Sequence, residues 1–173
     1  VISMGGTFIR LVDQGHDVHV AYQTSGNIAV FDEEALRFAD FMSDMAVKFK
    51  LSDPISKKLF DEVRESIRDK KIDSVDTDAV RSIKGIIRRG EAKAACRYVG
   101  IPDQNVHFLD MPFYETGRVK KAPLAAVDVK IVEDIIREVK PHQIYAAGDL
   151  ADPHGTHRVC LDAIMKAVVN LKD

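Results

Sequence analysis

Hydrophobic positions along the chain follow two different periods. In six stretches apolar residues recur every three or four positions, and in three others they form short runs between turn residues. The first spacing predicts amphipathic helices, whereas a short apolar run bounded by turns predicts a buried strand. The predicted helices cover residues 4–11, 32–50, 54–68, 76–99, 126–139 and 158–171, and the predicted strands cover 17–24, 105–109 and 143–147.

The order of these elements indicates the class of fold. Helices separate the three predicted strands, an order typical of a parallel sheet with helices on both faces. We therefore predict an α/β fold, a three-layer Rossmann-like sandwich with a mostly parallel sheet. The helices between two of the strands exceed what one crossover needs, so we predict a helical insertion at about 32–80 that acts as a cap or a dimer surface.

Both ends of the sequence carry helices without an adjoining strand. Val1 leads into the first predicted helix, and an α/β domain normally feeds such a helix from a buried strand. The last predicted helix is likewise not followed by a strand. We therefore expect one domain over residues 1–173 that is truncated at its N-terminus and also at its C-terminus.

Composition and charge exclude several classes of function. The chain is 46% hydrophobic and 30% charged, and its 25 basic and 27 acidic residues give a net charge of −2. That balance predicts neither a nucleic-acid nor a membrane surface, and no apolar run approaches the ~20 residues of a membrane span. Cys96 and Cys160 lie among apolar neighbours, so we expect buried free thiols in a reducing cytoplasm.

Candidate chemistry is expected where the strands end. Ligands of open parallel sheets bind at the carboxyl ends of the strands, which here precede the loops 24–31, 110–123 and 148–157. The last of these loops holds two aspartates and two histidines, and the histidines are three residues apart at a helix start. These loops are therefore the places where a site is expected.

The histidines of the last loop allow two interpretations. Neutral imidazole is a good zinc ligand, and residues three apart on a helical turn face the same side. Polar residues before a helix are also typical of capping and surface positions, so the spacing alone leaves both interpretations open. Each remaining histidine is predicted to be structural, in a turn or within or beside a strand: His16, His19, His107 and His142.

A family resemblance favours the metal interpretation. Residues 153–157 read Pro-His-Gly-Thr-His and resemble the late Pro-His-x-x-His element of LmbE-like (PIG-L type) N-acetylglucosaminyl deacetylases. The resemblance implies that His157 is a zinc ligand. It implies that His154 is the catalytic histidine, which polarises the tetrahedral intermediate or protonates the leaving amine. Thr156 replaces the aspartate that the family commonly has before its second histidine.

Two further segments resemble the same family. Residues 88–95 resemble its Arg-x-x-Glu helix, which implies that Arg88 contacts substrate, although a solvated helix face is the alternative. Residues 108–112 resemble the strand end that opens a substrate loop, which makes Asp110 a second candidate contact. Residues 147–154 are most similar to a subgroup in which the domain is fused behind glucosamine-6-phosphate deaminase.

The family's first motif, His-Pro-Asp-Asp, is absent from this sequence. In the family it supplies two zinc ligands and the catalytic base, and a catalytic zinc site needs about three protein ligands. The resemblance therefore implies Zn²⁺ for the intact site, and weak or missing binding and no activity for this chain alone.

The resulting hypothesis is a zinc-dependent hydrolase domain of a longer protein related to glucosamine-6-phosphate deaminase. It would remove an N-acetyl group from an N-acetylglucosamine-like amino sugar. The expected partners are an amino sugar or a sugar phosphate and, through the helices at 32–80, a second copy of the chain. The alternative is a non-catalytic module that binds sugar phosphate or mediates oligomerisation.

Overall fold

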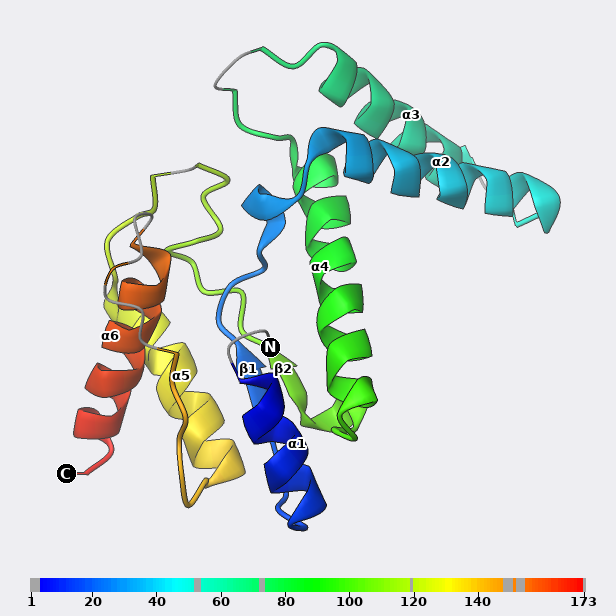
Figure 1. Ribbon diagram of the computed structural model, residues 1–173. Helices are drawn as coiled ribbons and strands as arrows, with labels where there is room; N and C mark the ends of the chain where they lie inside the picture. Colours follow the sequence, from blue (N-terminus) through cyan, green and yellow to red (C-terminus); the bar gives the residue numbers. More distant parts are fainter. Residues whose placement is uncertain are drawn as a thin grey trace. The chain divides into compact units, whose positions relative to one another are not determined.

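The chain forms two compact units. The computed structural model describes residues 4–51, 54–71, 74–118, 120–147, 151 and 155–172 (Figure 1). Unit 1 consists of Val1–Ser25 together with Ala92–Asp173, and unit 2 consists of Gly26–Glu91. Unit 2 therefore includes the whole segment predicted as a helical insertion at 32–80.

Unit 1 is built on a small parallel sheet. Strand β1, Val20–Tyr22, pairs in parallel with strand β2, Val106–Phe108, and Val20 lies opposite Val106. Both strands begin with a buried valine, as expected for β-branched residues that suit a pleated buried surface. The parallel pairing agrees with the predicted α/β class.

Helix α1, Gly5–Asp13, belongs to the core beneath this sheet. Its Phe8 and Val12 pack against a buried cluster that includes Cys96 and Ile101. Gly15 follows the helix with a φ of 78°, a left-handed conformation that glycine adopts without steric cost. This confirms the predicted helix and its end at Gly15.

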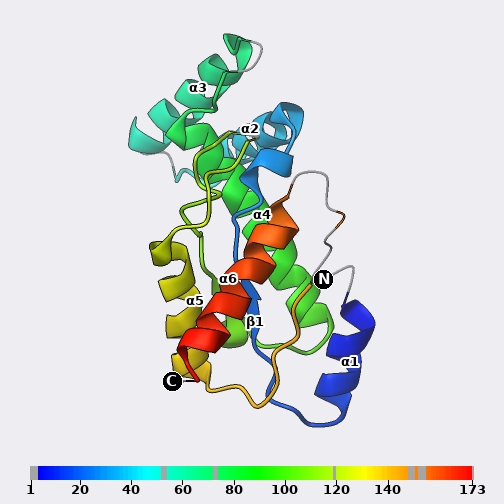
Figure 2. The ribbon, with the colours of Figure 1, turned by 90° about the vertical axis from the view of Figure 1, so that its left-hand side faces the viewer.

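Two further helices of unit 1 pack on each other. Helix α5, Ala126–Val139, and helix α6, Thr156–Asn170, lie side by side, as both ribbon views show (Figure 2). Valines on α5 and small alanines on α6 are buried: Val129, Val132, Ala163 and Ala167. Asn170 Nδ2 also donates a hydrogen bond of 2.8 Å to Glu133 Oε1, which joins the two helices near the end of α6.

Unit 2 is helical. Helices α2, Asp32–Lys48, and α3, Pro54–Arg68, pack on each other, and helix α4, Asp78–Tyr98, begins in this unit and continues into unit 1. Its core consists of four buried apolar residues from the three helices: Ala39, Phe60, Val63 and Val80. Pro54 is the first residue of α3. The N–H of a first helical residue has no acceptor within the helix, so proline costs no hydrogen bond there.

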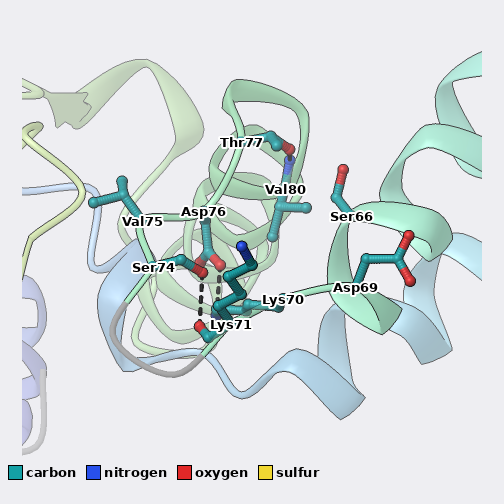
Figure 3. A pocket seen from close by; sticks show the side chains of 9 residues that line it. All are labelled: Ser66, Asp69, Lys70, Lys71, Ser74, Val75, Asp76, Thr77 and Val80. Carbon is teal, nitrogen blue, oxygen red and sulfur yellow. Dashed lines mark hydrogen bonds and ion pairs between the residues drawn. The ribbon is translucent and has the colours of Figure 1, made fainter.

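Two lysines and two aspartates form a cluster of ion pairs in unit 2. The cluster joins α2, α4 and the segment between α3 and α4. The Lys84 ammonium lies 2.6 Å from Asp32 Oδ1 and 2.7 Å from Asp76 Oδ2, and the Lys84 side chain is only 4% exposed. Lys70 Nζ lies 2.9 Å from Asp32 and 2.6 Å from Asp76, so each cation contacts both carboxylates. Figure 3 shows Lys70 and Asp76 among the side chains that line a cavity of about 260 Å³.

The charges of this cluster shift two pKa values. Burial alone would raise the pKa of Asp32, but hydrogen bonds and charge from Lys84 and Lys70 lower it below its usual value. Burial alone would lower the pKa of Lys70, but Asp76 and Asp32 raise it. Both shifts favour the charged forms, so the cluster is held together by matched ion pairs.

One predicted element is wrong and the three-layer sandwich is not confirmed. Residues 143–147, predicted as a short buried strand, form no strand, and all five are exposed. The sheet in the described residues has two strands, because a strand needs a neighbour for its N–H and C=O groups and this segment has none there. Within the described ranges, no helix is long and apolar enough to cross a membrane.

Candidate functional site

The loops that follow β1 and β2 are held together by backbone hydrogen bonds. Leu109 N donates to Tyr22 O at 2.9 Å, and Met111 N donates to Gln23 O at 2.9 Å, so the pairing continues past both strand ends. Ser25 N donates to Glu115 Oε1 at 3.1 Å, which fixes the loop after β1 to the longer loop after β2. The carboxyl end of the sheet, where ligands of such folds bind, is thus a defined surface.

Asp110 lies directly after β2 on this surface. It is partly buried and has a φ of 43°, in the left-handed region. Few residues other than glycine adopt that conformation, although aspartate is enriched among them, and such positions concentrate at functional sites. The backbone therefore keeps Asp110 among the candidate substrate contacts, and its role stays a prediction.

Arg88 belongs to the part of α4 that lies in unit 2. Its guanidinium forms an ion pair with Glu91 one helical turn later, and its side chain is 48% exposed. A Cβ placed on Gly26 would lie 3.2 Å from Arg88 Nε, so the arginine packs closely against the glycine of this turn. Gly26 has a φ of 70°, so both its conformation and this contact call for glycine. The Arg-x-x-Glu spacing thus corresponds to an ion pair beside a tight turn.

His157 lies in the first turn of α6 and is exposed. Its predicted companion His154 lies outside the described residues, as do Asp149 and Asp152. Among the residues that the structure describes, no group of three or more His, Cys, Asp or Glu side chains could hold a metal ion. A catalytic zinc needs about three protein ligands, so the described residues alone do not fit a zinc ion.

Two of the histidines predicted to be structural contact each other. His19 Nδ1 lies 2.9 Å from His107 Nε2, and the ring centroids are 5.2 Å apart with an interplanar angle of 12°. The nearly parallel planes and the short N–N distance fit a hydrogen bond that joins the rings edge to edge, with one shared proton. His19 Nε2 lies 3.4 Å from Asp17 Oδ2, so the bond extends to a carboxylate.

The environment of His107 favours its neutral form. Burial lowers the pKa of His107, and the nearby His19 lowers it further, while Glu138 acts in the opposite direction. A neutral ring can accept or donate the single proton of the His19–His107 bond, whereas two imidazolium rings would repel each other. The pair lies along β2 and just before β1, away from the loops that follow these strands.

A basic part of the loop after β2 was not among the residues singled out in the sequence. Lys121 Nζ lies 4.2 Å from the centroid of the Tyr114 ring and donates to Arg118 O at 3.0 Å. Burial lowers the pKa of Lys121, although the charge of Glu115 raises it. The signal in the sequence is the absence of any acidic residue between 116 and 127, alongside three cations.

Comparison with known proteins assigns the chain to a family. The family model described as PIG-L, GlcNAc-PI de-N-acetylase, matches residues 1–168, and the chain belongs to this family. The named activity of the family is hydrolysis of an N-acetyl group, and this confirms the resemblance found in the sequence. No solved structure matched the chain with significance.

A relative from Bacteroides thetaiotaomicron is 55% identical to the chain over 169 residues. It is named as a glucosamine-6-phosphate deaminase-like protein, in keeping with the predicted subgroup. The aligned region covers 97% of this chain and 26% of the relative, so the chain spans about a quarter of the length of that protein.

Proposed function

We propose that this chain contributes to a hydrolase domain that removes the N-acetyl group from an amino sugar related to N-acetylglucosamine. The proposal is carried by the family match over residues 1–168. The Pro-His-x-x-His element at the start of α6 supports it, because that is where the family resemblance places catalytic groups. The reaction adds water to an amide and releases acetate and a free amine.

The proposed roles follow the sequence pattern. His154 protonates the leaving amine or stabilises the oxyanion of the tetrahedral intermediate, in the manner of general acid and electrostatic catalysis. Arg88 and Asp110 contact the sugar through a guanidinium and a carboxylate. His157 would supply one of the ligands of the zinc ion that the family implies, and a bound zinc ion would supply an activated water.

The first test is acetate release from N-acetylglucosamine and from its 6-phosphate by the full-length protein. We expect activity in the wild type and a loss of roughly 100-fold or more in His154→Ala, the typical contribution of a general acid. Lys166→Ala on the exposed face of α6 is the control, with unchanged activity expected. Acetate release that persists in His154→Ala would remove His154 from the mechanism, and its absence in the wild type would contradict the proposal.

Zinc content is measured separately on the same protein. His157→Ala should lower the zinc bound per chain, because an imidazole ligand is lost, whereas Lys166→Ala should leave it unchanged. Zinc that remains fully bound in His157→Ala would show that His157 is not a ligand, whatever the activity. The cytoplasm is the proposed location, in keeping with Cys96 and Cys160, neither of which forms a disulfide with another described residue.

The second candidate function is an oligomerisation module, and the exposed apolar side chains of unit 2 favour it. Several large apolar residues on or beside α2 are exposed: Phe31, Phe38, Phe41, Met42, Val47, Phe49 and Leu51. Such surfaces often mark protein interfaces. Light scattering coupled to size exclusion tests this function, because Phe41→Ser with Met42→Ser should convert a dimer into a monomer. A monomeric wild type would contradict it.

A further inference from the structure

The loop between β2 and α5 borders a second cavity, which is open at the surface where Arg118 and Lys120 are exposed. Its volume is about 440 Å³, and five described residues line it: Thr116, Arg118, Lys120, Lys121 and Ala122. Three of these five side chains are cations and none is a carboxylate. A volume of this size is within the range of small-molecule sites. The cavity therefore has room for a small ligand, and its positive lining favours a ligand with negative charge.

Buried contacts fix the shape of this loop. Ala122 N donates to Phe113 O at 3.1 Å, which closes the segment between them into a compact loop. Phe113 is 1% exposed, and its N–H donates to Asp128 Oδ1 at 3.0 Å. The other oxygen of the fully buried Asp128 accepts from Ala125 N at 2.9 Å. The loop is thus anchored at Phe113, Ala122 and Ala125, and its basic residues are held on a fixed base.

Positive charge predominates among the residues that line the cavity, and the nearby Glu115 acts on Lys121 without lining the cavity. Within the described part of the chain, no carboxylate forms an ion pair with Arg118, Lys120 or Lys121. Lys121 is partly buried beside the Tyr114 ring, and burial disfavours its charged form. Three cations placed together repel one another, and a bound anion would relieve this repulsion.

We infer that the cavity lined by Arg118, Lys120 and Lys121 binds the phosphate of a phosphorylated amino sugar. A guanidinium matches phosphate oxygens with two parallel hydrogen bonds, and an ammonium adds a mobile point charge. The loop follows directly from the carboxyl end of β2, the edge at which ligands of parallel sheets bind. The inference rests on the proposed function, since it specifies the substrate of that reaction as a phosphate monoester.

The experiment titrates the full-length protein with inorganic phosphate and follows the backbone amides of residues 116–122 by NMR. We expect saturable shifts in the wild type, and an affinity at least roughly tenfold weaker in Arg118→Gln with Lys120→Gln, since charged hydrogen bonds are lost. Lys166→Gln, an exposed lysine of the same unit, is the matched control for charge and should bind as the wild type does. Circular dichroism verifies that each variant is folded.

A second arm compares acetate release from N-acetylglucosamine 6-phosphate and from N-acetylglucosamine. The double variant should raise KM for the phosphorylated sugar and leave the unphosphorylated sugar unaffected. A third arm measures binding to vesicles that contain phosphatidylinositol, to separate a lipid headgroup from a soluble monoester. We expect no vesicle binding that depends on these residues.

Each outcome decides the inference. Phosphate binding that is weakened only in the double variant supports it, even if no acetate is released and the proposed hydrolysis fails. Phosphate binding that is absent, or equal in wild type and double variant, overturns it, even if deacetylation is observed. Binding to vesicles without binding to inorganic phosphate also overturns it.

Discussion

Lys84 in unit 2 is buried and Lys121 in unit 1 is partly buried, and their surroundings have opposite effects on the charge of the side chain. Lys84 contacts the carboxylates of Asp32 and Asp76, and Lys70 contacts the same two groups, so two cations meet two anions. Lys121 lies beside an aromatic ring and near two further cations. The surroundings of Lys121 lower the pKa of Lys121, whereas the surroundings of Lys70 raise the pKa of Lys70.

This difference separates a structural role from a binding role. A buried cation that is paired with carboxylates stabilises the fold, and because those carboxylates neutralise its charge it does not attract an anionic ligand. A group of cations without such partners costs stability in the free protein, and a ligand can restore the balance. Four predictions test this contrast by removing one charge, anchor or ring at a time.

The largest effect is expected in unit 2. Lys84→Ala leaves Asp32 and Asp76 with Lys70 alone, and breaking a buried ion pair costs roughly 3 kcal/mol or more of unfolding free energy. Urea denaturation measures the loss, with Lys58→Ala on the exposed surface of α3 as control. The same variant should raise the pKa of Asp32, because Lys84 lowers it in the wild type. Equal stability of the two variants would contradict the assigned role of the cluster.

An intermediate effect is expected at Asp128. Asp128→Asn replaces one of the two acceptor oxygens by an amide donor, which leaves Phe113 N or Ala125 N without its partner. An unsatisfied buried donor costs roughly 1–3 kcal/mol, which a shift of the thermal midpoint would show. Phosphate affinity should fall as well, since the loop loses its anchor. A destabilised variant with unchanged phosphate affinity would disconnect the anchor from the cavity.

A smaller effect is expected at His107, and it depends on pH. The pKa of His107 in the folded protein is lowered below its usual 6.5, so the unfolded chain binds more protons just below that pH. Its contribution to stability is therefore present above pH 6.5 and is lost as the pH falls. In His107→Gln the thermal midpoint should depend less on pH between about 5 and 7. An unchanged slope would mean that other groups govern acid stability.

The smallest effect on stability is expected in the cationic cavity. Lys120→Gln removes a charge without a carboxylate partner, so the unfolding free energy should change by no more than about 0.5 kcal/mol. Urea denaturation in parallel with Lys84→Ala gives the direct contrast between the two clusters. A loss as large as that of Lys84→Ala would show that Lys120 is structural and would weaken the case for a ligand.

Much of the helical structure could be predicted from the sequence. The apolar spacing of α1, α2, α4 and α5 and the stop at Gly15 depend on local preferences, which sequence alone reveals. Residues 143–147 show the limit, because an apolar run is compatible with a strand but pairing depends on a neighbouring strand. No local pattern contains that information.

The candidate site was predictable only where a family motif carried it. Arg88, Asp110 and His157 came from such motifs, and the structure describes their surroundings without testing their roles. The cavity at Arg118 and Lys120 depends on the fold of a loop, and the His19–His107 bond depends on strand register. The run of cations between 116 and 127 indicates the charge of that loop but not its shape, and nothing in the spacing of His19 and His107 predicts their contact.

Helix α4 has a consequence for dissecting the protein. The boundary between Glu91 and Ala92 falls inside this continuous helix, whereas the other boundary falls at the turn before Gly26. Cleavage at the helical boundary would leave unpaired N–H and C=O groups on both new ends. Separate expression of residues 26–91 would therefore sever this helix. The two units are therefore best exchanged between homologues as whole-helix modules, with junctions placed outside Asp78–Tyr98.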